Sequence, residues 1–175
     1  MNMNTKDIQL RIDRARWWAI REQPFYGQLA MSLADELGHV GTASTDGRRI
    51  TWDPKFVESL SDEELRFVLL HEVLHCALGH LWRFPKHDEL VNRACDNAIN
   101  HTLLNISGIS MPKVGVAEPE FRGMAEEEIL RILRQRQQQQ AASQPQTSQQ
   151  QAGEQGSGRS GQSGQSGSAG SGNNE

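Results

Sequence analysis

The C-terminal segment, residues 135–175, cannot contribute to a hydrophobic core. It contains no Leu, Ile, Val, Met, Phe, Tyr, Trp or Cys, and Gln, Gly and Ser dominate it. Without apolar side chains to bury, it cannot offset the roughly 1–2 kcal/mol per residue that ordering a backbone costs. We therefore expect one folded domain over residues 1–134 and a disordered tail over residues 135–175.

The composition argues against nucleic-acid and membrane binding. The formal net charge is −4, so no basic surface for a phosphate backbone is expected. The longest apolar stretch, residues 67–82, is interrupted by three histidines and a glutamate, and the first residues lack the pattern of a signal peptide. Cys76 and Cys95 fit a reducing compartment as small buried residues. We expect a soluble, cytoplasmic protein.

The spacing of apolar residues predicts a mostly helical chain with one β-hairpin. Small and β-branched residues flank Asp46-Gly47 within residues 40–52, which is the pattern of a hairpin turn. Ser61 and Glu64 have the spacing of a capping box, so a long helix is expected to begin just after the serine. We expect helices over residues 8–19, 25–37, 62–81, 88–104 and 125–137.

The segment His71-Glu72-Val73-Leu74-His75 is an HExxH motif in the middle of the helix that follows Ser61. Four residues at about 100° each bring His71 and His75 onto one face, so both imidazoles can reach one metal ion. Glu72 projects beside that face, where its carboxylate can deprotonate a water molecule. Zinc is the expected metal, although manganese or iron can use the same ligands.

A zinc site of this kind needs a third protein ligand, and two residues are candidates. Asp96 lies on the next predicted helix, on a polar stripe with Asn92 and Asn100, which could orient its carboxylate by hydrogen bonds. His80 is five residues after His75, so on a continuous helix it points about 140° away from it. It could join the site only if the helix ended before it. We favour Asp96 and keep His80 as the alternative.

Three ordered motifs carry a resemblance to a known family, and they read TDGRRITWDPKFVESLSDEELRFVLLHE, HEVLHCALGHLWR and NRACDNAINHTLL. They resemble the metallopeptidase-domain family of bacteria and phages whose longer members carry a von Willebrand factor A-like domain after the peptidase domain. The similarity spans about residues 15–133. Because this family is grouped with zincin-like peptidases, it implies an α+β fold, mostly helical, with a small antiparallel hairpin or sheet beside the HExxH helix.

The resemblance also implies an activity. It implies a peptidase with one Zn²⁺ per chain, and it favours Asp96 as the third ligand beside His71 and His75. Glu72 would act as the general base and pass the proton to the leaving amine. One strand of the hairpin would pair with an extended peptide or protein substrate. A von Willebrand factor A-like protein or an ATPase is the expected partner.

Two other functions fit the same residues. The first is a metal-stabilised module that binds a protein partner without turnover, which the family's coupling to von Willebrand factor A-like domains suggests. The second is a metal-dependent hydrolase of a non-peptide amide or ester. The HExxH motif alone does not separate these two functions from peptide hydrolysis.

Overall fold

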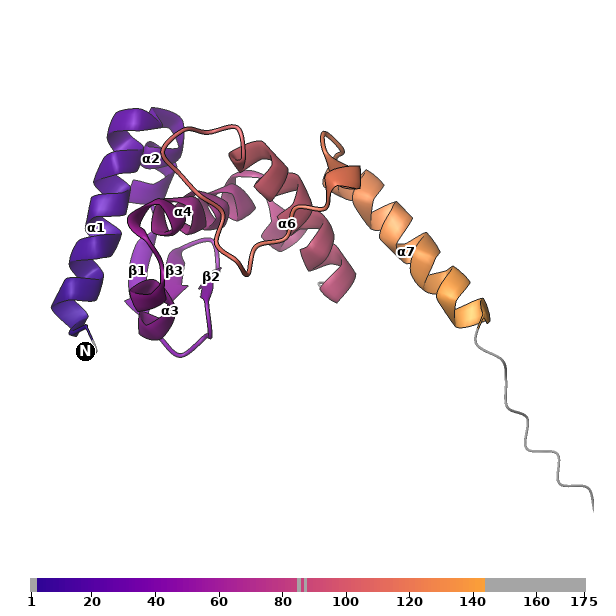
Figure 1. The fold of residues 1–175 in the computed structure, drawn as a ribbon, viewed down its shortest axis with the longest axis horizontal. Coiled ribbons are helices and arrows are strands. Elements are labelled where there is room, and N and C mark those ends of the chain that lie inside the picture. Colours follow the sequence, from indigo (N-terminus) through magenta and orange to yellow (C-terminus); the bar gives the residue numbers. More distant parts are fainter. Residues whose placement is uncertain (1–2, 85, 87, 144–175) are drawn as a thin grey trace, which may run out of the picture. The chain divides into compact units, whose positions relative to one another are not determined.

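The computed structural model describes residues 3–84, 86 and 88–143, which form helices and one small sheet (Figure 1). This confirms the α+β class. The helices are α1 (Thr5–Glu22), α2 (Pro24–Met31), α3 (Pro54–Ser59), α4 (Asp62–Ala77), α5 (His80–Arg83), α6 (Glu89–Leu103) and α7 (Glu126–Ser143), with a 3-10 helix at Pro119–Phe121. The strands are β1 (Ala34–Leu37), β2 (Ala43–Thr45) and β3 (Arg49–Trp52).

The sheet has the strand order β1-β3-β2 and is mixed, whereas we expected a purely antiparallel sheet. β2 and β3 form the predicted antiparallel hairpin, with Thr45 opposite Ile50. β1 lies parallel to β3 on its other side, with Ala34 opposite Arg49. The difference arises because residues 25–37, which we expected to form one helix, divide between α2 and β1.

A partly buried carboxylate fixes β1 in this sheet. Asp35 accepts a hydrogen bond from the Trp52 indole N–H at 2.8 Å and pairs with the Arg16 guanidinium of α1. Arg16 also donates to the backbone carbonyl of Ala30, so its side chain joins α1, α2 and β1. Because a largely desolvated ion pair is tolerated only where further hydrogen bonds satisfy it, these contacts specify the position of β1.

The predicted Asp46-Gly47 pair builds the turn between β2 and β3. Gly47 has a φ of 85°, in the left-handed region that glycine enters without steric cost. The Asp46 carboxylate accepts hydrogen bonds from the backbone N–H groups of Arg48 and Arg49 at 2.8 and 2.9 Å. The hairpin is therefore confirmed, and it leaves β2 at the edge of the sheet.

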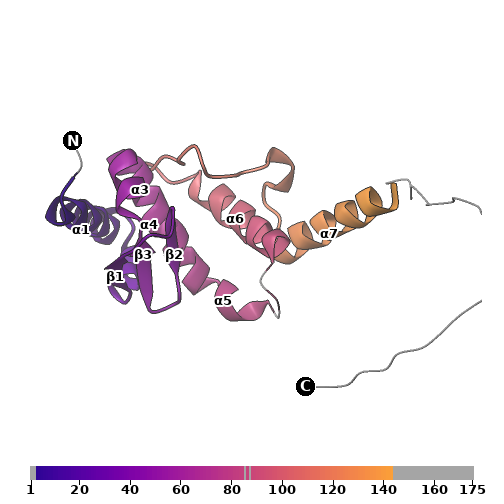
Figure 2. The same ribbon diagram turned by 90° about the horizontal axis from the view of Figure 1, so that it is seen from below.

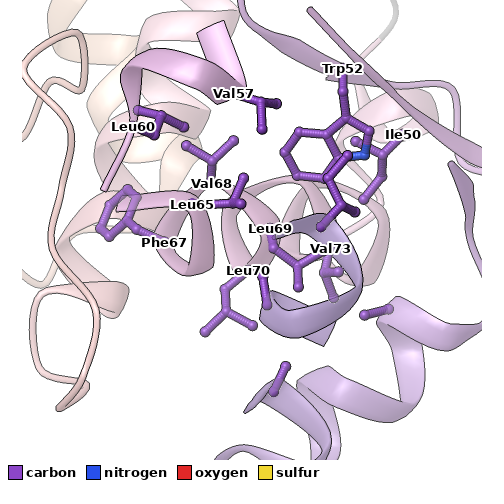
Figure 3. Close-up of a cluster of buried hydrophobic side chains, with 14 of the residues drawn as sticks. Ile50, Trp52, Val57, Leu60, Leu65, Phe67, Val68, Leu69, Leu70 and Val73 are labelled. Atoms are coloured by element: carbon purple, nitrogen blue, oxygen red, sulfur yellow. The ribbon is translucent and has the colours of Figure 1, made fainter. Parts of the chain in front are cut away.

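α4 begins with the predicted capping box and supplies much of the main core. The Ser61 side chain accepts from the Glu64 N–H at 3.1 Å, and the Glu64 carboxylate accepts from the Ser61 N–H at 2.8 Å. The helix packs against α1, α2, α6 and β2. Figure 3 shows part of the main core, with side chains that include Leu65, Leu69, Val73, Ile50, Trp52 and Val57.

α4 ends at Ala77, earlier than the expected end near residue 81. Gly79 has a φ of 72° directly after the C-cap residue Leu78, which is a common way for a helix to stop. The chain then forms the separate short helix α5. His80 therefore lies on a different helix from His71 and His75, and its direction cannot be derived from the helical spacing of that pair.

A second hydrophobic cluster joins α6 to α7. Ala94 and Cys95 of α6 face this cluster, whereas Ile99 and Leu103 of the same helix pack into the main core. α6 thus belongs to both clusters. The other buried members of the second cluster are Phe84, Val91, Phe121, Ile129, Leu130 and Leu133.

α1 and α2 approach each other at Gly27, which is buried. A Cβ atom at this position would lie 2.5 Å from both the Cα and the N atom of Ile20, and 2.7 Å from the carbonyl carbon of Ala19. These are backbone atoms, which cannot move aside as a flexible side chain can. The crossing of the two helices therefore depends on the absence of a side chain at residue 27.

α7 continues to Ser143, beyond the expected end at residue 137. Residues 135–143, which we assigned to the tail, are therefore helical, and the rest of the predicted tail lies outside the described residues. None of the helices in the described part of the chain combines the length and the apolar composition that crossing a membrane requires.

We propose that the independently folding unit ends at Ser143, and a shortened chain tests this. Both hydrophobic clusters consist of residues before this point, so a chain that ends at Ser143 is expected to keep the melting temperature of the full chain. A chain that ends at Gly123 loses Ile129, Leu130 and Leu133 and should melt at a clearly lower temperature. Circular dichroism melting measures both. A large drop for the longer chain would contradict the proposal.

Candidate metal centre

His71 and His75 lie on the same face of α4, one turn apart, as the spacing of the motif predicts. Their Nε2 atoms are 2.9 Å from each other, and their side chains are 16 % and 18 % exposed. The aromatic ring of Phe67, one turn before His71, stacks beside its imidazole with 6.5 Å between ring centroids. The two histidines are therefore partly buried, and Phe67 of the same helix packs against the His71 ring.

Asp96 of α6 completes a cluster with these two histidines. Its Oδ1 atom lies 3.4 Å from the His71 Nε2 atom and 3.2 Å from the His75 Nε2 atom. The three ligand atoms all lie within 4.8 Å of one another. The structure thus brings together the two motif histidines and the carboxylate that the sequence favoured as third ligand.

The donor set and its spacing fit a zinc ion. Two imidazole nitrogens and one carboxylate oxygen are a common catalytic ligand set for this metal. Donor atoms about 2.1 Å from a tetrahedral ion lie about 3.4 Å from one another. The separations among the His71, His75 and Asp96 ligand atoms are 2.9, 3.2 and 3.4 Å, which is at this value or slightly below it.

A hydrogen-bond chain orients the His71 imidazole. The Asn100 amide nitrogen donates to the backbone carbonyl of Val116 at 2.8 Å, which turns the Asn100 carbonyl oxygen toward the His71 Nδ1 atom, also at 2.8 Å. A carbonyl oxygen only accepts, so Nδ1 carries a hydrogen, and in the neutral form of the ring, which binds metals, the Nε2 lone pair faces the cluster. We had expected Asn100 or Asn92 to orient the Asp96 carboxylate. Asn100 instead contacts His71, because its position on α6 faces that ring.

His80, the alternative third ligand, lies apart from this cluster. Its Nδ1 atom is 3.2 Å from the His75 Nδ1 atom, on the side of the ring opposite the Nε2 atom that faces Asp96. Its Nε2 atom is 3.1 Å from a carboxylate oxygen of Glu126. The helix does stop before His80, as a ligand role would require, but the turn at Gly79 brings it behind the His75 ring.

Glu72 is buried at 7 % exposure and lines the same cleft as His71 and His75. Within the described residues its carboxylate has no hydrogen-bond partner, unlike the carboxylates of Asp96 and Glu126. Burial raises the pKa of Glu72 above its usual value, although the neighbouring histidines act in the opposite direction. The carboxylate is therefore free to accept a proton from a molecule in the cleft.

His71 and Asp96 each stabilise the charged form of the other. Burial acts to lower the pKa of His71, but the hydrogen bond to Asp96 and the charges of Glu72 and Asp96 outweigh it, so the pKa is raised. Burial acts to raise the pKa of Asp96, but hydrogen bonds from His71 and His75 hold the pKa well below its usual range. Asp96 therefore stays ionised at neutral pH, as an anionic ligand must.

The cluster opens into a cleft of about 560 Å³. Thr42 and the strand β2, which is the strand nearest α6 in Figure 2, line this cleft, and residues 114–116 line it as well. Cys95 also lines the cleft, but burial raises the pKa of its thiol to about 12, so it is not a thiolate at neutral pH. The remaining lining residues include Phe56, Phe67, Val68, Leu81, Asn92 and Asn100.

The comparison with protein families matches residues 8–175 to a family described as "Putative metallopeptidase domain". The chain belongs to this family. Membership supports a metallopeptidase-like function at a coarse level, implies a metal ion, and implies a peptide or protein substrate. The comparisons with curated proteins and with solved structures gave no match.

Within this metallopeptidase domain, the sequence analysis missed one residue near the site, Glu126, because no motif or spacing connects it with His80.

Proposed function

We propose that this domain is a zinc-dependent peptidase in which His71, His75 and Asp96 hold one Zn²⁺ ion. The observation that carries the proposal is the convergence of the His71 lone pair, the His75 Nε2 atom and an ionised carboxylate on one point. Imidazole lone pairs and a carboxylate this close together repel one another unless protons or a metal cation lie among them. Zinc, when bound, supplies a Lewis acid that polarises a carbonyl and lowers the pKa of water to about 7.

The proposed role of Glu72 is to move the proton. Its carboxylate lies in the cleft beside the two histidines and has no other hydrogen-bond partner in the described residues. It accepts a proton from the attacking water and passes it to the amine that leaves. A general base of this kind contributes about 10²–10⁴-fold to the rate.

The proposed substrate is an extended peptide that lies along β2. This strand is the edge of the sheet, and Ala43, Ser44 and Thr45 line the cleft that contains the metal cluster. An unpaired strand edge offers backbone N–H and C=O groups to a further strand. Pairing there places the backbone of the substrate beside Glu72 and the cluster, independent of most of its side chains.

Metal analysis of the purified chain, without added metal, tests the ligand assignment. We expect about one zinc per chain, and at least about 100-fold weaker zinc binding for Asp96→Ala, because even residues that only orient a ligand cost 10–100-fold when replaced. Asn92→Ala is the matched control: it lies one turn before Asp96 on the same helix and lines the same cleft. It should bind zinc like the wild type.

Two results would decide against this assignment. Unchanged zinc affinity in Asp96→Ala would remove Asp96 from the ligand set. A purified wild-type chain that binds none of zinc, manganese or iron would remove the metal centre itself. Manganese or iron at one equivalent would change the metal and keep the three ligands.

A further inference from the structure

The carboxylate of Glu126 lies near the proposed metal ligands but contacts them only through His80. Glu126, the first residue of α7, is 7 % exposed, and one of its oxygens lies 3.1 Å from the His80 Nε2 atom. His80 is 1 % exposed, and its Nδ1 atom lies 3.2 Å from the His75 Nδ1 atom. Contacts at hydrogen-bond distance therefore run from α7 through α5 to a proposed zinc ligand on α4.

The chemistry of the three groups sets the direction of these hydrogen bonds. An ionised carboxylate only accepts, so the His80 Nε2 atom carries a hydrogen and donates it to Glu126. In a neutral imidazole the other nitrogen then has a lone pair, so the His80 Nδ1 atom accepts. Its partner, the His75 Nδ1 atom, must donate. When His75 is neutral, its remaining nitrogen, Nε2, is left with a lone pair that faces Asp96.

We propose that His80 and Glu126 are positioning residues that hold His75 in the tautomer and orientation that bind the metal. The inference rests on the metal centre proposed above. It gives His75 the same kind of support that Asn100 gives His71, namely an acceptor at Nδ1 that leaves Nε2 free. Acceptors of this kind raise the basicity of a ligand histidine and fix its ring.

Arg83 keeps the Glu126 carboxylate in place. It donates to Glu126 and also to Glu127, the next residue of α7. Only Glu126 reaches His80, whereas the Glu127 side chain is 56 % exposed. Burial acts to raise the pKa of Glu126, but hydrogen bonds from its own backbone N–H, His80 and Arg83 outweigh burial and lower the pKa, which agrees with an ionised acceptor.

A simpler role for His80 and Glu126 is to join α5 and α7, and a pair of variants separates the two roles. Glu126→Gln and Glu127→Gln each remove one negative charge from the first turn of α7 and one charged partner of Arg83. Only the first changes the acceptor of His80. Positioning predicts a defect in zinc binding for Glu126→Gln alone, while joining of helices predicts lower stability without a specific zinc defect.

The experiment measures zinc affinity by competition with a chelator, the melting temperature of the metal-free protein, and the ¹⁵N shifts of the His75 ring. We expect Glu126→Gln to weaken zinc binding about 10-fold and Glu127→Gln to leave it unchanged. In the metal-free wild type above about pH 8, where ordinary imidazoles are neutral, the ¹⁵N shifts should show hydrogen on His75 Nδ1. His80→Phe, which removes the acceptor, should weaken zinc binding more than Glu126→Gln.

Each result bears on the inference separately from the metal centre. Equal zinc affinity for wild type and Glu126→Gln would overturn the positioning role and leave the zinc site intact. If the wild type binds no metal, the proposed function fails, and the ¹⁵N shifts still decide the hydrogen-bond direction: hydrogen on His75 Nε2 overturns it. If His80→Phe does not fold, Glu126→Gln with its Glu127→Gln control carries the test.

Discussion

Replacing Glu72 with Gln is expected to lower kcat/KM for peptide hydrolysis by about 10²–10⁴-fold while zinc content and fold stay unchanged. Glutamine has the shape of glutamate but cannot accept the proton of the attacking water. The carboxylate is not among the three clustered ligand atoms, so its loss leaves the metal ligands in place. Zinc content by atomic emission and cleavage of a peptide library measure the two effects.

The matched control is Glu63→Gln. Glu63 lies on the same helix, in its exposed first turn, so its replacement removes the same charge far from the cleft. It should leave hydrolysis unchanged. Full hydrolysis by Glu72→Gln would contradict the proposed mechanism, whereas loss of zinc together with activity would show that Glu72 supports the metal and is not only a base.

Replacing Gly27 with Ala is expected to destabilise the domain by about 3 kcal/mol or more. The added methyl group would lie 2.5 Å from two backbone atoms of Ile20, so α1 and α2 would have to separate. Arg16 would then lose its hydrogen bond to Ala30 on α2, which also supports the ion pair with Asp35. Urea unfolding followed by tryptophan fluorescence measures the free energy of unfolding.

Gln28→Ala serves as the control for this substitution. Gln28 is the next residue of α2 and is exposed, and alanine is the better helix former. Its free energy of unfolding should equal or slightly exceed that of the wild type. A Gly27→Ala variant as stable as the wild type would mean that the two helices can shift apart at no cost.

The elements that local chemistry specifies could be predicted from the sequence. The Asp46-Gly47 turn and the Ser61/Glu64 capping box depend on residues at most three apart, and both form as expected. β1 could not be predicted, because Ala34–Leu37 has no β-branched residue and continues a helical pattern. Its strand conformation depends on pairing with β3 and on the contact of Asp35 with Trp52, which lies 17 positions later in the chain.

In the candidate site, too, the residues with local spacing could be predicted from the sequence, whereas those that depend on tertiary packing could not. The spacing of His71 and His75 follows from helical geometry, and the polar stripe of α6 indicated Asp96 before its position was known. The role of His80 depended on the left-handed turn at Gly79, which ends the helix before the predicted position. Glu126 is 46 positions away from His80, and only the packing of α7 against α6 brings the two together.

The proposed metal centre would also contribute to the stability of the domain, because its ligands lie beside residues of both hydrophobic clusters. His71 and His75 stand on α4, whose apolar face belongs to the main core, whereas Asp96 directly follows Cys95 of the second cluster. An ion held by all three ligands is a cross-link between the two clusters. By linkage, ion at 100 times its Kd adds about 2.7 kcal/mol to the free energy of unfolding. Chelation would therefore remove this contribution and lower the free energy of unfolding of the domain.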